Sequence, residues 1–248
     1  MSEVIATTIA CQEHDLLAAP SRARARTSSS PQGAARRPPP PVFAQCGLMP
    51  ADLLPLGPDA RLALDALLTV ERGEAGAVVG HQWIRDLQPP RGASGRWSRR
   101  GDRRGLFALP VHTSALAGPR GWVPCPTGQK GPPLLLVNGA TEALAAATLL
   151  RSRGRPLVVA APPGQWTQEA IAGLRSLAEA QRFVTVLLGF PETARGAALA
   201  AEAVQVLEGA LWIPPAVREV RPPSPLGGEP PFSWTAALRG IRGPGMAQ

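Results

Sequence analysis

Arginines gather in residues 91–104, with Trp97 among them and Trp83 and Phe107 on either side, and this combination can recognise nucleic acid. The segment reads RGASGRWSRRGDRR and has a net charge of +5, from six arginines against one aspartate. Guanidinium groups bind phosphates and aromatic rings stack on bases, so the mixture suits a nucleic-acid strand. We therefore predict an interface formed by Arg96, Trp97, Arg99, Arg100, Arg103 and Arg104. A solvated loop without a site is the alternative.

The positive charge is confined to two segments. The 248 residues carry 26 lysines and arginines against 18 acids, a net charge of +8. Residues 20–41 hold five arginines and no acid, so with residues 91–104 they contribute more than the whole surplus. This charge favours a polyanionic partner, nucleic acid first. Because residues 20–41 are rich in proline and poor in large apolar side chains, we expect a disordered arm over residues 1–47.

Residues 131–222 alternate between short apolar runs and runs of helix formers, which is the pattern of a parallel α/β sheet. Strands separated by helices in this way form βαβ units. The apolar fraction of 44% can supply a core. The predicted strands cover 134–137, 156–161, 183–188 and 211–213, and the predicted helices cover 141–151, 167–180 and 193–207. Function gathers at the carboxyl ends of parallel strands, where Asn138, Glu142 and Glu192 follow two of these runs.

The rest of the chain is less regular. Residues 48–130 predict a small α+β region, with a helix over 59–72, a strand over 76–80 and then long loops rich in Gly, Pro and Arg. Residues 223–248 predict a tail with a short helix. The expected organisation is therefore an arm, a small α+β region, an α/β domain and a tail.

The order of turns in the α/β domain resembles the Toprim domain, which bacterial-type primases, type IA topoisomerases and related nucleases share. The resemblance covers about 134–220 and implies a Rossmann-like parallel sheet with flanking helices. Residues 80–107 look like the strand-rich segment that precedes Toprim in primase-like proteins of phages and mobile elements, and Phe232 to Leu238 resembles their closing helix. The motifs that carry it are Asn138-Gly139 with Glu142-Ala143-Leu144-Ala145, Pro162-Pro163-Gly164, and Glu192 followed by Thr193-Ala194-Arg195-Gly196-Ala197-Ala198.

The departures from the Toprim pattern affect its catalytic positions. In that family a glutamate after the first strand is the acid/base, and an Asp pair after the third strand holds Mg²⁺. Here the glutamate position is Asn138 and the first Asp position is Phe190, while Glu192 and the accessory Glu142 keep carboxylates. The resemblance thus implies a weak Mg²⁺ site at Glu142 and Glu192, with nucleotidyl transfer weakened or lost. It also adds Arg195 to the predicted interface.

Two function classes follow. The first is a primase-like Toprim protein of DNA replication or mobile-element metabolism that binds single-stranded or primed DNA. The second is a non-catalytic interaction module, Rossmann-like as in the C-terminal domain of transketolase-like enzymes, that docks on a replication or conjugation protein. An α/β-hydrolase site is excluded because no G-x-S-x-G motif is present and no histidine follows His112.

Cysteine content and hydropathy bear on location. Three scattered cysteines do not form a disulfide framework, which is typical of a reducing cytoplasm. No run of 18 apolar residues or secretory leader is evident, so we expect a cytoplasmic protein without a membrane partner.

Overall fold

The computed structural model describes residues 38–63, 65–118, 120–211, 215–224 and 232–243. The described residues all belong to one unit, Pro38–Gln248, and most of the predicted arm lies outside the described residues. The prediction of disorder is wrong for the end of that arm, because helix α1 (Pro41–Cys46) buries Val42, Phe43 and Cys46. Its proline starts the helix and its apolar side chains anchor it in the core.

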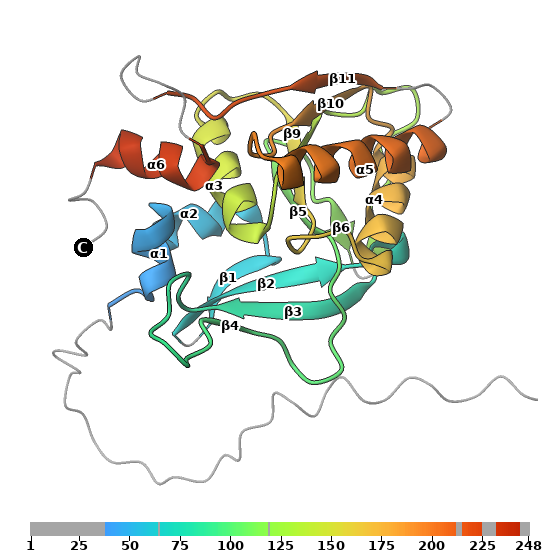
Figure 1. Cartoon of the computed structure of the whole chain (residues 1–248). Helices are drawn as coiled ribbons and strands as arrows, with labels where there is room; N and C mark the ends of the chain where they lie inside the picture. Colours follow the sequence, from blue (N-terminus) through green and yellow to red (C-terminus); the bar gives the residue numbers. More distant parts are fainter. Residues whose placement is uncertain (1–37, 64, 119, 212–214, 225–231, 244–248) are drawn as a thin grey trace, which may run out of the picture. The chain divides into compact units, whose positions relative to one another are not determined.

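A five-stranded sheet lies at the centre of the fold (Figure 1). Its order is β11-β10-β8-β9-β5, with β8, β9, β10 and β11 parallel and β5 antiparallel to β9. The predicted parallel sheet is confirmed, but β5 shows that it extends across the boundary predicted at residue 130. Most of the strand predicted at 211–213 lies outside the described residues. The last strand of the sheet, β11, begins after that segment, at Ala216. The bounds are β5 (Phe107–Val111), β8 (Leu134–Leu136), β9 (Leu157–Ala161), β10 (Thr185–Leu188) and β11 (Ala216–Glu219).

Helices cover both faces of this sheet, as predicted. Helix α3 (Ala140–Arg151) packs on one face, and α4 (Gln168–Gln181) and α5 (Ala194–Ala210) pack on the other. Alternate residues of each strand enter different cores: Leu135 faces α3, whereas Leu134 and Leu136 face α4 and α5. Thr167 caps α4, since its Oγ1 accepts a hydrogen bond from the Ala170 N–H at 3.1 Å.

A second, antiparallel sheet replaces the helix predicted over 59–72. Leu62 lies opposite Leu67 in a hairpin of the first two strands. All seven residues of β2 are buried, so its sequence lacks the alternation typical of a half-exposed strand. A short 3₁₀ turn, η2 (Glu74–Gly76), precedes the strand predicted near residue 76. The sheet order is β1 (Ala60–Ala63), β2 (Ala66–Arg72), β3 (Val78–Ile84) and β4 (Arg96–Trp97).

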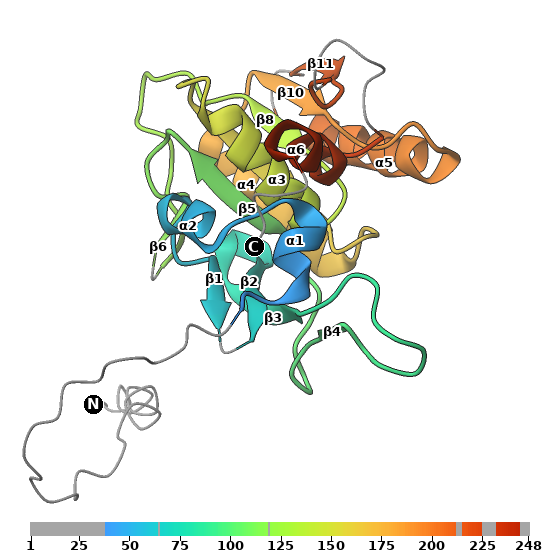
Figure 2. The same ribbon diagram turned by 90° about the vertical axis from the view of Figure 1, so that its left-hand side faces the viewer.

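The predicted closing helix, α6 (Trp234–Arg242), packs on α3 and α1 (Figure 2). Arg242 holds its end through two hydrogen bonds of 2.6 and 2.8 Å to Asp52. The short helices α2 (Pro50–Leu53) and η1 (Leu54–Leu56) lead into β1, and a small hairpin pairs β6 (Ala117–Gly118) with β7 (Gly121–Trp122).

Within the described part of the chain, no helix has the length and apolar character needed to cross a membrane.

Candidate nucleic-acid interface and strand-end cavity

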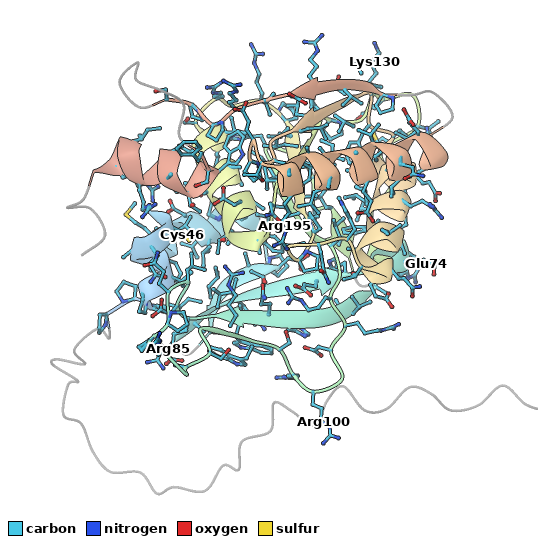
Figure 3. The ribbon with its side chains drawn as sticks, viewed as in Figure 1. Cys46, Glu74, Arg85, Arg100, Lys130 and Arg195 are labelled. Carbon is cyan, nitrogen blue, oxygen red and sulfur yellow. The ribbon has the colours of Figure 1, made fainter. Side chains whose placement is uncertain are left out.

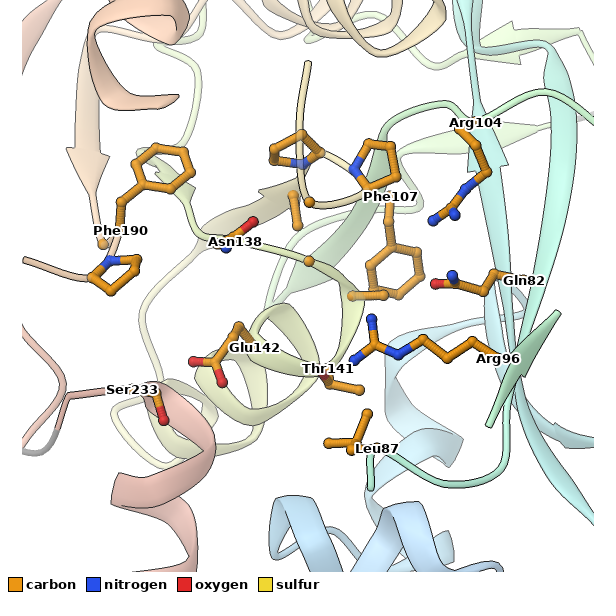
Figure 4. A pocket seen from close by; sticks show the side chains of 18 of the residues that line it. Gln82, Leu87, Arg96, Arg104, Phe107, Asn138, Thr141, Glu142, Phe190 and Ser233 are labelled. Atoms are coloured by element: carbon orange, nitrogen blue, oxygen red, sulfur yellow. The ribbon is translucent and has the colours of Figure 1, made fainter. Parts of the chain in front are cut away.

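A cavity of about 360 Å³ lies between the carboxyl ends of the parallel strands and the inner face of the second sheet. The turns after β8 and β9 form one side of it. Gly139 (φ 88°) and Gly164 (φ 91°) make these turns with left-handed backbone, which glycine adopts without a steric penalty. Strands β2, β3 and β4 supply the other side, so the cavity joins residues far apart in the sequence. Side chains that line it, shown in Figure 4, include Gln82, Leu87, Arg96, Arg104, Phe107, Asn138, Thr141, Glu142, Phe190 and Ser233.

Glu142 lines the cavity, but its carboxylate holds the start of α6. Its Oε2 accepts a hydrogen bond from the Trp234 N–H, and its Oε1 accepts one from the Thr235 hydroxyl, both at 2.6 Å. Burial raises the pKa of this carboxyl, and the hydrogen bonds from α6 only partly oppose that effect. Both oxygens are therefore engaged by a helix about 90 residues away in the sequence.

Glu192 lies apart from this arrangement. Its side chain is 65% exposed and pairs with Arg221, and it lines a neighbouring depression next to α5 instead of the cavity. Among the residues that the structure describes, no three His, Cys, Asp or Glu side chains are grouped to hold a metal ion. The two carboxylates predicted to share Mg²⁺ are thus engaged with different partners in different places.

The other two catalytic positions of the resemblance also line the cavity. Asn138 lies in the turn after β8, and its Oδ1 is buried without a hydrogen-bond partner among the described residues. Phe190 follows β10 and supplies no oxygen ligand. At the positions that line the cavity, the chain therefore offers a neutral amide, a phenyl ring and a carboxylate that caps a helix in place of the acidic residues of the Toprim pattern.

The predicted basic interface divides between two faces of the second sheet. Side chains alternate along a strand, so Arg96 and Trp97 on β4 point in opposite directions. Arg96 lies opposite the fully buried Ile84 and points into the cavity (Figure 4). Trp97 lies opposite Trp83 on the other face. The sequence places these residues side by side, but the pleat separates them.

Arg96 enters the cavity without a partner. Its guanidinium makes no hydrogen bond or ion pair with any residue in the described ranges. Burial lowers the pKa of Arg96, Cys46 opposes this effect, and the positive charge of Arg104 makes the smallest contribution, which also lowers the pKa. Arg96 is consequently a cation whose charge the surrounding protein does not neutralise.

Arg104 is instead fixed by a buried acid. Its Nε donates to both carboxylate oxygens of Glu71 at 3.0 and 2.9 Å, and the same carboxylate accepts the Gly105 N–H. Glu71 is 2% exposed and lies on the inner face of β2. The ion pair therefore positions Arg104 at the wall of the cavity.

The outer face of β3 and β4 carries aromatic and basic side chains together. Trp97 is 41% exposed, and the guanidinium carbon of Arg99 lies 5.4 Å from the centre of the Trp83 ring. The His81 ring lies 5.9 Å from the same tryptophan. Arg100 extends away from the loop that follows β4 (Figure 3). We call His81, Trp83, Trp97 and Arg99 the outer platform.

The remaining predicted interface residues make contacts within the protein. Arg103 pairs with Glu169 in the first turn of α4. Arg195 donates a hydrogen bond of 2.7 Å to the Gly164 carbonyl, which fixes the turn after β9. The sequence interpretation counted Trp83 among the aromatic side chains near the basic segment but did not list it as an interface residue, and it missed Glu71. Strand alternation with Trp97 would have found Trp83 if the β3–β4 pairing had been known, whereas Glu71 gives no local signal.

Comparison with known proteins gives structural neighbours but no sequence relatives. No protein-family model and no curated protein matches the sequence. The Aquifex aeolicus primase (zinc-binding and RNA polymerase domains) is similar over 63% of this chain and 34% of its own, with 17% identity and a TM-score of 0.39. The primase fragment of the bacteriophage T7 primase-helicase is similar over 73% of this chain and 62% of its own, with 12% identity and a TM-score of 0.37. A DNA primase domain from Pseudomonas aeruginosa is similar over 72% of this chain and 48% of its own, with 13% identity and a TM-score of 0.42. The chain spans between a third and two thirds of the length of these neighbours. TM-scores between 0.37 and 0.42 do not support an argument about function, which therefore depends on the residues of this chain.

Proposed function

We propose that the protein is a primase-like, Toprim-type protein of DNA replication or mobile-element metabolism that binds single-stranded or primed DNA, with metal-dependent nucleotidyl transfer weakened or lost. The observation that carries the binding is the outer platform, where Trp97 is exposed beside Trp83 and Arg99. Bases stack on the indole rings, and Arg99 and Arg100 contact phosphates. Stacking requires unpaired bases, which is why the proposal specifies a single strand.

The loss of transfer is supported by the strand-end positions. Metal-assisted attack at phosphorus requires acidic ligands that are free to bind the ion. In this chain Asn138 and Phe190 provide none, and Glu142 caps α6. These positions support the proposal that nucleotidyl transfer is weakened or lost.

The binding is tested with a fluorescent oligothymidylate titrated by anisotropy at several salt concentrations. Trp97→Ala removes one stacking surface and should weaken binding by about 1–3 kcal/mol. Arg99→Gln with Arg100→Gln should make the slope of log K against log salt shallower by about 1.4, or about 0.7 for each lost phosphate contact.

Arg153→Gln with Arg155→Gln is the matched control, because it removes the same charge from the exposed loop after α3. It should leave the slope of log K against log salt as in the wild type. Weak binding that does not vary with salt, or full affinity in Trp97→Ala, would instead favour the interaction module that docks on a partner protein.

A primer-synthesis assay with Mg²⁺ or Mn²⁺ tests the loss of transfer, and we expect no products above background. The comparison uses Glu192→Ala and, as the control, Glu202→Ala, which removes an exposed acid from α5. Robust synthesis that Glu192→Ala abolishes and Glu202→Ala does not would refute this part of the proposal.

A further inference from the structure

Arg61 lies on the same face of the second sheet as the outer platform, although two strands separate them in the sequence. It is opposite Leu68 on β2, and Leu68 is opposite Trp83 on β3. Trp83 is in turn opposite Trp97 on β4. Residues directly opposite each other on neighbouring strands carry their side chains on the same face. The four side chains therefore form one row that crosses the sheet from β1 to β4.

The charge of Arg61 is not neutralised by its neighbours. Its side chain is exposed and has no hydrogen-bond or ion-pair partner among the residues that the structure describes. The two acids closest to it along the chain have other partners: Asp59 pairs with Arg72 at 2.7 Å, and Asp65 pairs with Arg85 at 3.3 Å. An anion that lies across the sheet can therefore bind Arg61 without displacing an ion pair.

The row has binding groups at its two ends and none between them. Leu68, between Arg61 and Trp83, is 4% exposed and offers neither a charge nor an aromatic ring. Neighbouring strands lie about 4.8 Å apart, so three spacings put Arg61 about 14 Å from Trp97 across the sheet. A stacked strand rises about 3.4 Å per nucleotide, so about four nucleotides cover this distance.

We propose that a single strand crosses the second sheet from β4 to β1, with bases on Trp97 and Trp83 and a phosphate about four nucleotides farther along on Arg61. The inference rests on the proposed binding of single-stranded DNA. It adds the direction of the strand and a phosphate contact outside the outer platform. A guanidinium suits this contact because its planar fork matches the oxygens of a phosphate.

The other direction open to the strand follows β3. Arg85, two residues after Trp83, lies on the same face as that tryptophan because side chains alternate along a strand. Its guanidinium already pairs with Asp65, so a phosphate there would compete with a carboxylate. The unpaired Arg61 therefore favours the direction across the sheet.

Oligothymidylates of two lengths test this direction with the full-length protein. A strand of about eight nucleotides spans the whole row, whereas one of about two covers only the tryptophans. Anisotropy gives the affinity of the longer strand, and competition against it gives that of the shorter one. At about 0.1 M salt, Arg61→Gln should weaken the longer strand about fivefold, because one lost phosphate contact lowers the salt slope by about 0.7. The affinity of the shorter strand should not change.

Arg218→Gln is the matched control. Arg218 is an exposed arginine on β11, which is an edge strand of the other sheet as β1 is of this one. The variant should bind both lengths like the wild type. Normal binding of the longer strand by Arg61→Gln, an equal loss for both lengths, or a loss of the same size in Arg218→Gln would overturn the inference. A loss in Arg85→Gln with none in Arg61→Gln would mean that the strand runs along β3.

Trp97→Ala separates the failure of this inference from the failure of the proposed function. If Trp97→Ala weakens the longer strand and Arg61→Gln does not, the proposed function stands and only the direction is refuted. If the wild type does not bind the longer strand, the proposed function fails and the inference fails with it.

Discussion

Glu142 shows how one carboxylate can keep its position while its role changes. Its pKa is raised, chiefly by burial, even though two donors from α6 bind it. The folded protein therefore holds the proton at pH values where the unfolded chain, with an ordinary value of 4.5, has already lost it. By linkage, the contribution of Glu142 to the free energy of unfolding falls as pH rises from below 4.5 through the raised pKa.

The pH dependence of the Glu142 contribution to the free energy of unfolding can be measured. Urea unfolding of the wild type and of Glu142→Gln, compared from about pH 4 to about pH 7, should show the wild type's advantage shrinking as pH rises. The variant lacks the titrating group, so subtracting the two curves removes the other carboxyls. An advantage that grows with pH would mean that the hydrogen bonds outweigh burial, and the assignment of the pKa shift would be wrong.

Sequence reasoning could place Glu142 but could not assign its partners. Its position after the first parallel strand was predicted correctly because strand and helix signals are local. Its hydrogen-bond partners, Trp234 and Thr235, are more than 90 residues away, and nothing in the sequence near Glu142 indicates them. The orientation of Arg96 could not be predicted either, since it depends on the pairing of β3 with β4.

At the scale of elements, α6 is the part whose attachment decides whether the cavity keeps its shape. Its first turn is held by Glu142, the Trp234 indole donates to the Gly189 carbonyl at 3.1 Å, and Arg242 pairs with Asp52 near the other end. Three separate anchors thus connect it to α3, to the turn after β10 and to α2. Phe232 and the N-cap residue Ser233, just before its first turn, line the cavity, so the start of the helix borders the site.

Loosening the far end of α6 tests this attachment. Arg242→Met breaks a largely buried ion pair, and we expect faster hydrogen–deuterium exchange in peptides from α6 and α1 with no change in β8 and β9. Arg239→Gln, on the same helix but exposed, is the control and should exchange like the wild type. Unchanged exchange in Arg242→Met would show that the other two anchors are sufficient.

The elements also show where local patterns fail. The parallel strands and their helices were predicted because each is bounded by glycine, proline or a cap such as Thr167. The hairpin of β1 and β2 was mistaken for a helix, because leucines at 62, 64, 67 and 68 fit a helical period as well as a buried strand. Burial of β2 on both faces removed the alternation that distinguishes the two.

For the whole molecule, the positive charge of the outer platform has a counterpart in arginines that lie outside the described residues. Residues 20–41 hold five arginines without an acid. Charge of this kind strengthens binding to any nucleic acid through counterion release and carries no preference for unpaired bases. The platform and the arm should therefore contribute independently.

Replacing those five arginines by glutamine tests the independence. The salt slope for single-stranded DNA should become shallower by up to about 3.5, which is about 0.7 for each phosphate contact. The loss caused by Trp97→Ala should keep the same size in this background, because independent sites contribute additively to the binding free energy. Both values come from anisotropy titrations of the same oligothymidylate over a range of salt concentrations. If the effect of Trp97→Ala disappears once the arm is neutral, the arm and the outer platform act on the strand as one surface, and the basic residues at 20–41 belong to the interface itself.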